Sequence, residues 1–248
     1  STLNLTGTLT QNLTTTNNAF YTVNFSGSGP FNINANFTAA NTTVTEAKAI
    51  NCSGNFMITQ SITPATSTVS LTATGSGNQI SLPTSNSFYN LTIDGVGGVW
   101  TLASAIGVAN TLTINNGALT DNAKAVSFKN ISIADKTGLL VSTATWTQNA
   151  SGEARCPNKE SRINNLSICG VGNVTTFTGD VSVNTITFGS GTLAGAAKNI
   201  YAYGSINSIA TAETVFTVNS AFSAIYTENH TSQNAFKLPN NLVTDSIY

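Results

Sequence analysis

The stretch Asn90-Leu91-Thr92-Ile93-Asp94-Gly95-Val96-Gly97 occurs twice in this chain. Its second copy is Asn165-Leu166-Ser167-Ile168-Cys169-Gly170-Val171-Gly172. Shorter matches extend the repeat, since Ala123-Lys124-Ala125-Val126 is similar to Ala197-Lys198-Asn199-Ile200. A tandem period, here about 75 residues, is typical of elongated repeat proteins rather than of a globular enzyme. We expect one elongated domain over residues 1–248, with copies at approximately 1–67, 68–143 and 144–212 and a partial copy at 213–248.

Short stretches in which apolar and small polar residues alternate run through the copies. Examples are Leu3-x-Leu5, Leu91-x-Ile93, Leu112-x-Ile114 and Ile186-x-Phe188. A period of two in β-branched and aromatic residues indicates strands with one buried face. Glycine and asparagine separate these stretches and supply the backbone conformations that tight turns need. Because helical periodicity is almost absent, the sequence predicts an all-β fold.

Two all-β architectures fit many short strands in such a period. Sandwich domains usually need about 100 residues each, and no linker rich in proline or charge separates the copies. A β-solenoid, with about three coils of about 25 residues in each copy, fits better, because coils stacked about 4.8 Å apart bury small inward residues in one continuous column.

Three segments carry a resemblance to a known class of protein. They are Val69-Ser70-Leu71-Thr72-Ala73-Thr74-Gly75, Phe88-Tyr89-Asn90-Leu91-Thr92-Ile93 and Thr111-Leu112-Thr113-Ile114-Asn115-Asn116-Gly117-Ala118-Leu119. The chain resembles the repeats of large secreted right-handed parallel β-helix proteins of prokaryotic surfaces. The resemblance covers most of the chain and implies a right-handed parallel β-helix with a surface, adhesive or matrix role and no catalytic residues. The first copy departs from the pattern, because Gly29-Pro30-Phe31-Asn32 replaces Gly97-Gly98-Val99-Trp100.

The composition argues against several classes of partner. Charged residues make up 8% of the chain and the net charge is −1, whereas about 25% charged residues is usual. The sequence therefore lacks the basic patch that nucleic-acid binding needs. No apolar run approaches the roughly 18 residues that cross a bilayer. We expect no nucleic-acid partner and no membrane insertion.

Residue types that perform catalysis are sparse. His230 is the one histidine, in the segment Glu228-Asn229-His230-Thr231, and we interpret it as an exposed loop histidine rather than as a catalytic base. The acidic residues are scattered singly, and no cysteine–histidine cluster indicates zinc. We expect no enzyme, no catalytic residue, no cofactor and no bound metal.

The cysteines and the asparagines suggest covalent features. Cys156 and Cys169 flank a loop and are candidates for a disulfide; the alternative is that Cys52 and Cys169 are small buried residues in strands. The motif Asn-x-Ser/Thr, which accepts N-linked glycans, is only slightly more frequent than chance predicts, and turn geometry explains several of these asparagines equally well. The candidate glycosylation sites are Asn4, Asn12, Asn24, Asn36, Asn41, Asn51, Asn90, Asn130, Asn149, Asn165, Asn173 and Asn229.

The densest charge in the chain suggests a contact site. The charged residues of this loop are Glu153, Arg155, Lys159, Glu160 and Arg162. Such a loop can contact a sister subunit or a ligand, although a solvated loop fits as well. Trp146 is a further candidate, because an exposed tryptophan can stack on a sugar ring, while a buried one fills a corner of the solenoid.

The leading functional hypothesis is an extracellular or cell-surface structural protein. Its copies would assemble into a filament, a pilus-like fibre or a surface layer, because a solenoid coil with unpaired edges can pair with another coil. The alternative is a glycan-binding adhesin or viral fibre module that acts through Trp146 and the 153–162 loop. The expected partners are copies of the chain itself or glycans.

Overall fold

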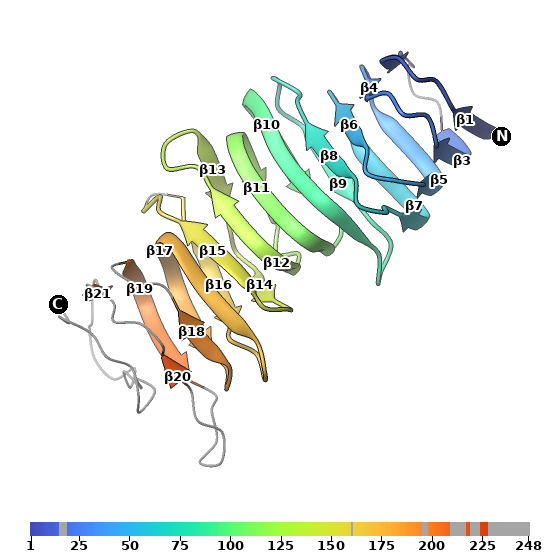
Figure 1. The fold of residues 1–248 in the computed structure, drawn as a ribbon. Helices are drawn as coiled ribbons and strands as arrows, with labels where there is room; N and C mark the ends of the chain where they lie inside the picture. Colours follow the sequence, from blue (N-terminus) through green and yellow to red (C-terminus); the bar gives the residue numbers. More distant parts are fainter. Residues whose placement is uncertain (15–18, 160, 195–197, 209–216, 219–223, 228–248) are drawn as a thin grey trace.

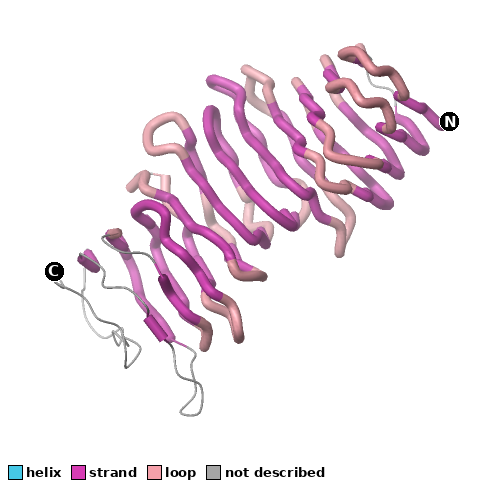
Figure 2. The backbone as a smooth tube through the Cα atoms, in the orientation of Figure 1, coloured by secondary structure: helices cyan, strands magenta, loops and turns pink. Residues whose placement is uncertain are grey.

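A computed structural model describes residues 1–14, 19–159, 161–194, 198–208, 217–218 and 224–227. These residues contain strands and no helix (Figure 2). The strands are β1 (Thr2–Leu5), β2 (Gln11–Leu13), β3 (Ala19–Phe25), β4 (Phe31–Ile33), β5 (Phe37–Val44), β6 (Ala49–Cys52), β7 (Phe56–Thr63), β8 (Thr68–Leu71), β9 (Asn78–Ser81), β10 (Ser87–Leu102), β11 (Ile106–Thr120), β12 (Val126–Ile133), β13 (Gly138–Val141), β14 (Thr145–Gln148), β15 (Gly152–Cys156), β16 (Ile163–Ile168), β17 (Val174–Phe188), β18 (Thr192–Ala194), β19 (Asn199–Ser208), β20 (Thr217–Val218) and β21 (Ala224–Thr227).

The strands form a β-solenoid of about ten coils, as the sequence predicts. Every ladder is parallel, and successive coils follow one another along a single stack from the N-terminus to β21 (Figure 1). The right-handed sense of the coil stays a prediction.

One coil shows how the chain is folded. Strand β11 bends twice, so that its segments 106–108, 111–114 and 118–120 lie on three different sides. We name these sides by their ladders. Face A contains 106–108, 126–128 and 146–148; face B contains 90–93, 111–114 and 130–133; face C contains 99–101, 118–120 and 139–141.

The core is a column of inward side chains that runs through the described coils. Alternate residues of the strands are buried, as in Leu112 and Ile114 of β11, and the buried residues from Val23 to Ile206 form one cluster. The buried residues are thus the apolar members of the alternating pattern in the sequence. The phenylalanines at the N-terminal end contact one another in a row, with ring centroids 5.1 to 6.0 Å apart: Phe25, Phe37, Phe56 and Phe88.

The coil is shorter than the sequence suggests. In the ladders, Asn32 pairs with Asn51 and Trp146 pairs with Leu166. One winding therefore takes about 20 residues rather than about 25 residues. The spacing between the two octets is consequently not a whole number of coils. Leu91 of the first octet belongs to the face B ladder through Leu112, whereas Leu166 of the second belongs to the ladder through Trp146 on face A.

The repeated octet instead encodes a strand followed by one type of turn. Gly97 and Gly172 occupy equivalent places in the two copies and have φ of +76° and +73°, a left-handed conformation that glycine adopts without a steric penalty. The valine before each glycine is exposed, with 72% of Val96 and 84% of Val171 accessible. The same strand–turn unit thus forms the corner after face B in one copy and the corner after face A in the other.

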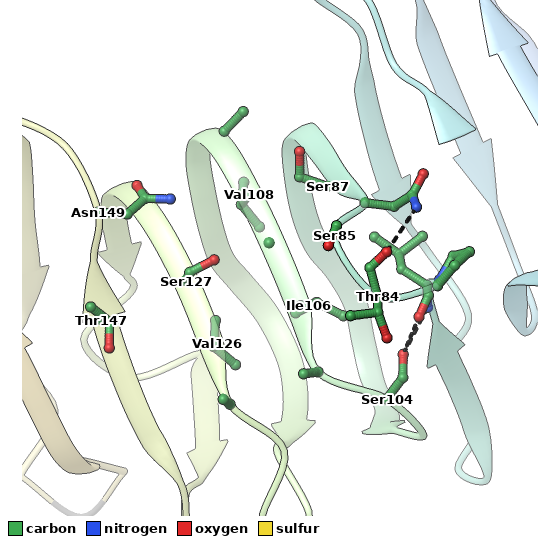
Figure 3. Close-up of a pocket in the computed structure, with 17 residues that line it drawn as sticks. Thr84, Ser85, Ser87, Ser104, Ile106, Val108, Val126, Ser127, Thr147 and Asn149 are labelled. Atoms are coloured by element: carbon green, nitrogen blue, oxygen red, sulfur yellow. Dashed lines mark hydrogen bonds between the residues drawn. The ribbon is translucent and has the colours of Figure 1, made fainter. Parts of the chain in front are cut away.

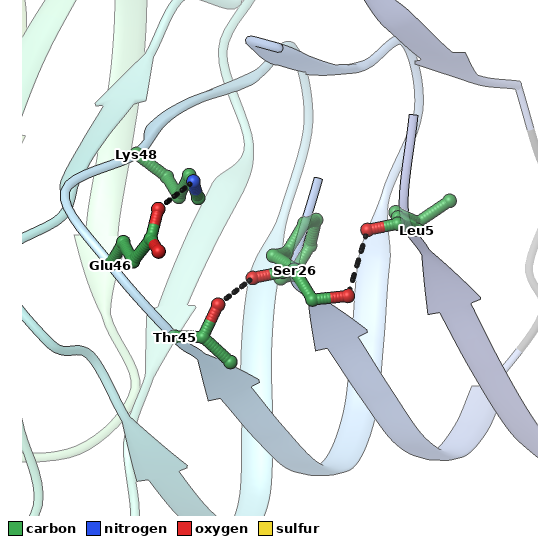
Figure 4. A network of polar contacts seen from close by, with 6 residues as sticks. Leu5, Ser26, Thr45, Glu46 and Lys48 are labelled. Carbon is green, nitrogen blue, oxygen red and sulfur yellow. Dashed lines mark hydrogen bonds and ion pairs between the residues drawn. The ribbon is translucent and has the colours of Figure 1, made fainter. Parts of the chain in front are cut away.

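Polar contacts join neighbouring coils at the corners. The Ser26 hydroxyl donates to the carbonyl of Leu5, and the Thr45 hydroxyl donates to the carbonyl of Phe25, each at 3.5 Å (Figure 4). Beside them the buried ammonium of Lys48 pairs with the exposed carboxylate of Glu46 at 3.0 Å. The two hydroxyl contacts add to the backbone hydrogen bonds that the same carbonyls of Leu5 and Phe25 accept from the next coil.

Candidate functional site

The charged loop packs against the solenoid instead of projecting from it. The Lys159 ammonium lies 4.0 Å from the centre of the Tyr201 ring, and the Arg162 guanidinium lies 4.0 Å from the Tyr203 ring. Cation–π contacts of this kind contribute about 0.5–1 kcal/mol each at exposed sites. The structure thus brings two of the predicted contact residues together with two tyrosines that the sequence reasoning missed.

The remaining members of the predicted contact site are dispersed. Glu153 is exposed on β15, and the Arg155 side chain lies over Gly179, where a Cβ would be 2.5 Å from its Cγ. Glu160 lies outside the described residues. The loop is therefore neither a simple solvated loop nor one continuous charged patch.

Trp146 cannot stack on a ligand, which corrects one of the two expectations for this residue. Its side chain is fully buried, and its ring contacts Phe128 with centroids 6.5 Å apart. The indole Nε1 donates to Asp121 Oδ2 at 2.9 Å. Trp146 therefore fills the solenoid interior, as does the equally buried Trp100.

Asp121 is a buried carboxylate that the sequence reasoning counted only among scattered acids. It accepts bonds from backbone N–H groups of Ala123, Thr143 and Ala144 and from the side chains of Ser142, Thr143 and Trp146, at 2.7 to 3.1 Å. Burial acts to raise the pKa of Asp121, but these hydrogen bonds outweigh it and hold the pKa below its ordinary value. The carboxylate is thus occupied in joining two coils.

The expected disulfide between Cys156 and Cys169 is absent. Both thiols are free and buried, like Cys52. Cys156 ends β15, whereas Cys169 follows β16 and its sulfur lies 3.4 Å from the carbonyl of Thr192. The chain between the two cysteines leads to a different side of the solenoid. The alternative, in which Cys52 and Cys169 are small buried residues in strands, is confirmed for the burial of both and for Cys52 in β6, whereas Cys169 lies just after β16 with φ of +55°.

Burial also suppresses thiol chemistry. It raises the pKa of Cys156 to about 12 and the pKa values of Cys52 and Cys169 to about 11 each. Since the thiolate is the reactive form, these cysteines are poor nucleophiles.

Many of the candidate glycosylation sites belong to asparagine ladders. The Asn51 amide donates to Asn32 Oδ1 at 2.9 Å, and the Asn32 amide donates to Asn12 Oδ1 at 3.1 Å. The amides of Asn24, Asn41, Asn90 and Asn130 also donate to neighbouring coils. Because an N-linked glycan is attached at this same nitrogen, the ladder explains these asparagines without glycosylation.

The other sequons differ in their surroundings. Asn149 is exposed, and Asn4, Asn12 and Asn36 are exposed with their Oδ1 atoms accepting hydrogen bonds. Asn165 and Asn173 are half-buried. Asn229 and His230 lie outside the described residues.

A groove of about 460 Å³ crosses face A (Figure 3). The loop 82–87 forms one wall, and Thr147 and Asn149 lie at the opposite side, with Ser127 between them. None of the 17 residues that line it is charged. Its hydroxyl and amide side chains include Thr84, Ser85, Ser87, Ser127, Thr147 and Asn149. The volume lies in the range of sites that hold small ligands, about 300–1,000 Å³.

Two further observations concern metals and membranes. Within the described ranges, no group of three or more histidine, cysteine or acidic side chains could hold a metal ion. The same residues include no helix of the length and apolarity that a membrane span requires.

Comparison with known proteins adds no relative. No protein-family model, no curated protein and no solved structure matches the chain.

Proposed function

We propose that the chain is a non-enzymatic structural protein of the cell surface or the extracellular space. Its copies assemble end to end into a filament, a pilus-like fibre or a surface layer. An uninterrupted core column and a surface with few charges support an extended scaffold, since neutral faces do not repel one another.

The first coil carries the main argument for assembly. Among the described strands, β1 pairs only with β3, and β2 pairs only with β4. The outer edge of each strand has no partner among the described residues, so a further coil, whether from an adjoining part of the polypeptide or from a second copy, can pair there. Two side-chain ladders also end there, because Asn4 and Asn12 accept amide bonds through Oδ1 and can donate through Nδ2. A coil from a second copy would continue both the backbone ladder and the asparagine ladder.

Electron microscopy and light scattering of the purified chain test this proposal. The wild type is expected to form filaments or sheets whose size grows with protein concentration. A double variant, Asn4→Lys with Asn12→Lys, places charges on the edge and is expected to stay monomeric. The matched control is Ala49→Lys with Gln79→Lys, at exposed positions of β6 and β9 within the stack, and it is expected to assemble. A wild type that stays monomeric, or an edge variant that assembles normally, would contradict the proposal.

The second candidate function is glycan recognition by an adhesin or viral fibre module. The buried Trp146 cannot contact a glycan, so the groove on face A is the feature that supports this function. Tyr201 and Tyr203 add half-exposed aromatic rings on β19. Binding of a glycan array by the purified chain, measured against the assembly-deficient edge variant, separates recognition from assembly.

A further inference from the structure

We propose that the groove on face A is a binding site for a neutral oligosaccharide that lies across the coils. This inference deepens the second candidate function and rests on it. The groove is defined by side chains from four successive coils, and its outward positions follow one ladder through Ser87, Gly107, Ser127 and Thr147.

The depth of the groove comes from small residues in its middle. Gly107 has no side chain, and a Cβ there would be 3.0 Å from Cβ of Ser87 and 3.3 Å from Oγ of Ser127. Ala109 and Ala125 are exposed beside it. The larger side chains of Thr147 and Asn149 and the loop 82–87 stand on either side (Figure 3). A larger side chain at any of these three positions would occupy the middle of the groove.

The chemistry of the lining selects the class of ligand. Hydroxyl groups both donate and accept hydrogen bonds, so Ser85, Ser127 and Thr147 are complementary to the hydroxyl groups of a sugar. The alanine methyl groups provide apolar contact for the C–H surface of a pyranose ring. A charged ligand would lose hydration without gaining an opposite charge, because no charged residue lines the groove.

A peptide strand fits less well than a sugar. Strand addition requires an open backbone edge. In the groove, 106–108 pairs with β10 and β12, and 126–128 pairs with β11 and β14. The backbone there is already paired on both sides, so recognition has to use side chains.

The loop that forms one wall is firmly held. The Asn86 Oδ1 accepts a hydrogen bond from the backbone of Ile62 at 2.8 Å, and the Ser104 hydroxyl contacts both the N–H and the carbonyl of Leu82 at 2.8 Å. Ser85 has φ of +65° and is exposed at the tip of this loop. A wall fixed in this way reduces the ordering cost of binding.

Calorimetric titration with neutral hexasaccharides of glucose, mannose, galactose and N-acetylglucosamine tests the proposal, with hexagalacturonate as the acidic probe. The protein is produced in a host without N-glycosylation, because a glycan on Asn149 would enter the groove. Ala125→Trp fills the floor, and Ala49→Trp adds the same side chain at an exposed position of β6 on another side. Thr147→Val removes one hydroxyl from an exposed position without changing shape.

At least one neutral probe is expected to bind the wild type and Ala49→Trp equally. Ala125→Trp should weaken binding more than tenfold, and Thr147→Val should weaken it about two- to tenfold through one lost hydrogen bond. Failure of every neutral probe to bind, equal binding by Ala125→Trp, or preference for the acidic probe would overturn the proposal. Thr147→Val keeps the test valid if Ala125→Trp does not fold. Electron microscopy of the same variants reports assembly separately, so loss of sugar binding with intact filaments leaves the assembly proposal standing. Sugar binding that Ala125→Trp does not weaken would overturn this inference and leave glycan recognition elsewhere on the chain standing.

Discussion

Replacement of Asp121 by asparagine is expected to destabilise the solenoid strongly. The carboxylate is fully buried and receives bonds from six donor groups of the two coils that it joins. An asparagine keeps the shape but turns one acceptor oxygen into an NH₂ donor. The NH₂ group of the new asparagine is best placed where Oδ1 of Asp121 lies. At the Oδ2 position this donor would face two further donors, the N–H groups of Ala144 and Trp146.

The magnitude follows from this orientation. The backbone N–H of Ala123 loses Asp121 Oδ1 but keeps a second acceptor, the Thr143 hydroxyl oxygen at 3.0 Å, so this change costs little. The bonds that remain at Oδ2 change from charged to neutral acceptors, and each weakens by about 1 kcal/mol. We therefore expect the free energy of unfolding to fall by about 3–5 kcal/mol.

Urea denaturation followed by tryptophan fluorescence measures the effect, since both Trp100 and Trp146 are buried. The control is Asp94→Asn, because Asp94 is exposed and accepts bonds from the amides of Asn115 and Asn116. This control is expected to cost less than about 1 kcal/mol. If the two variants lose equal stability, the reasoning about Asp121 is wrong.

The pH dependence of stability provides a second readout. The folded pKa of Asp121 is lowered, so its contribution is complete above the ordinary pKa of 3.8 and is lost as the pH falls through the folded value. The stability difference between the wild type and Asp121→Asn should therefore shrink as the pH falls below 3.8. A difference that stays constant down to the acid transition would contradict this account.

Three further predictions concern other buried or surface groups. The buried hydroxyl of Thr42 has no hydrogen-bond partner, so Thr42→Val should raise the free energy of unfolding by about 1 kcal/mol in the same urea assay, and a loss of stability would refute this reading. The three buried thiols should not react with an aromatic disulfide reagent in the native protein and should all react in denaturant; fast native labelling would contradict their burial. In a host that glycosylates sequons, mass spectrometry should find glycans at the exposed Asn149 and none at Asn51, whose amide is used in a ladder; the reverse pattern would be inconsistent with the ladder.

The strands and the inward residues were predictable because their signal is local. Alternation at Leu91 and Ile93 requires only that one side of each strand be buried, and both residues are buried. The length of the coil was not predictable from the spacing of the two octets. The two octets are similar because each forms the same type of turn, at Gly97 and at Gly172, and such a turn can occur at any corner.

The site residues were harder to predict because their roles depend on contacts between coils. Tyr201 and Tyr203 lie about 40 residues after the cations that they contact, which is two coils along the stack at about 20 residues each. Trp146 occupies an inward position of β14, and its hydrogen-bond partner Asp121 lies one coil earlier, which the sequence around Trp146 does not indicate. The groove on face A depends on the absence of side chains, as at Gly107, and a sequence motif does not record such an absence.

The use of one octet at two corners has an evolutionary consequence. Because the unit after Asn90 turns the chain from face B and the unit after Asn165 turns it from face A, gain or loss of a single unit advances the following sequence by one side of the molecule. Any outward row of side chains that crosses such a step continues on the adjacent side, and over many steps these rows would trace a spiral about the long axis.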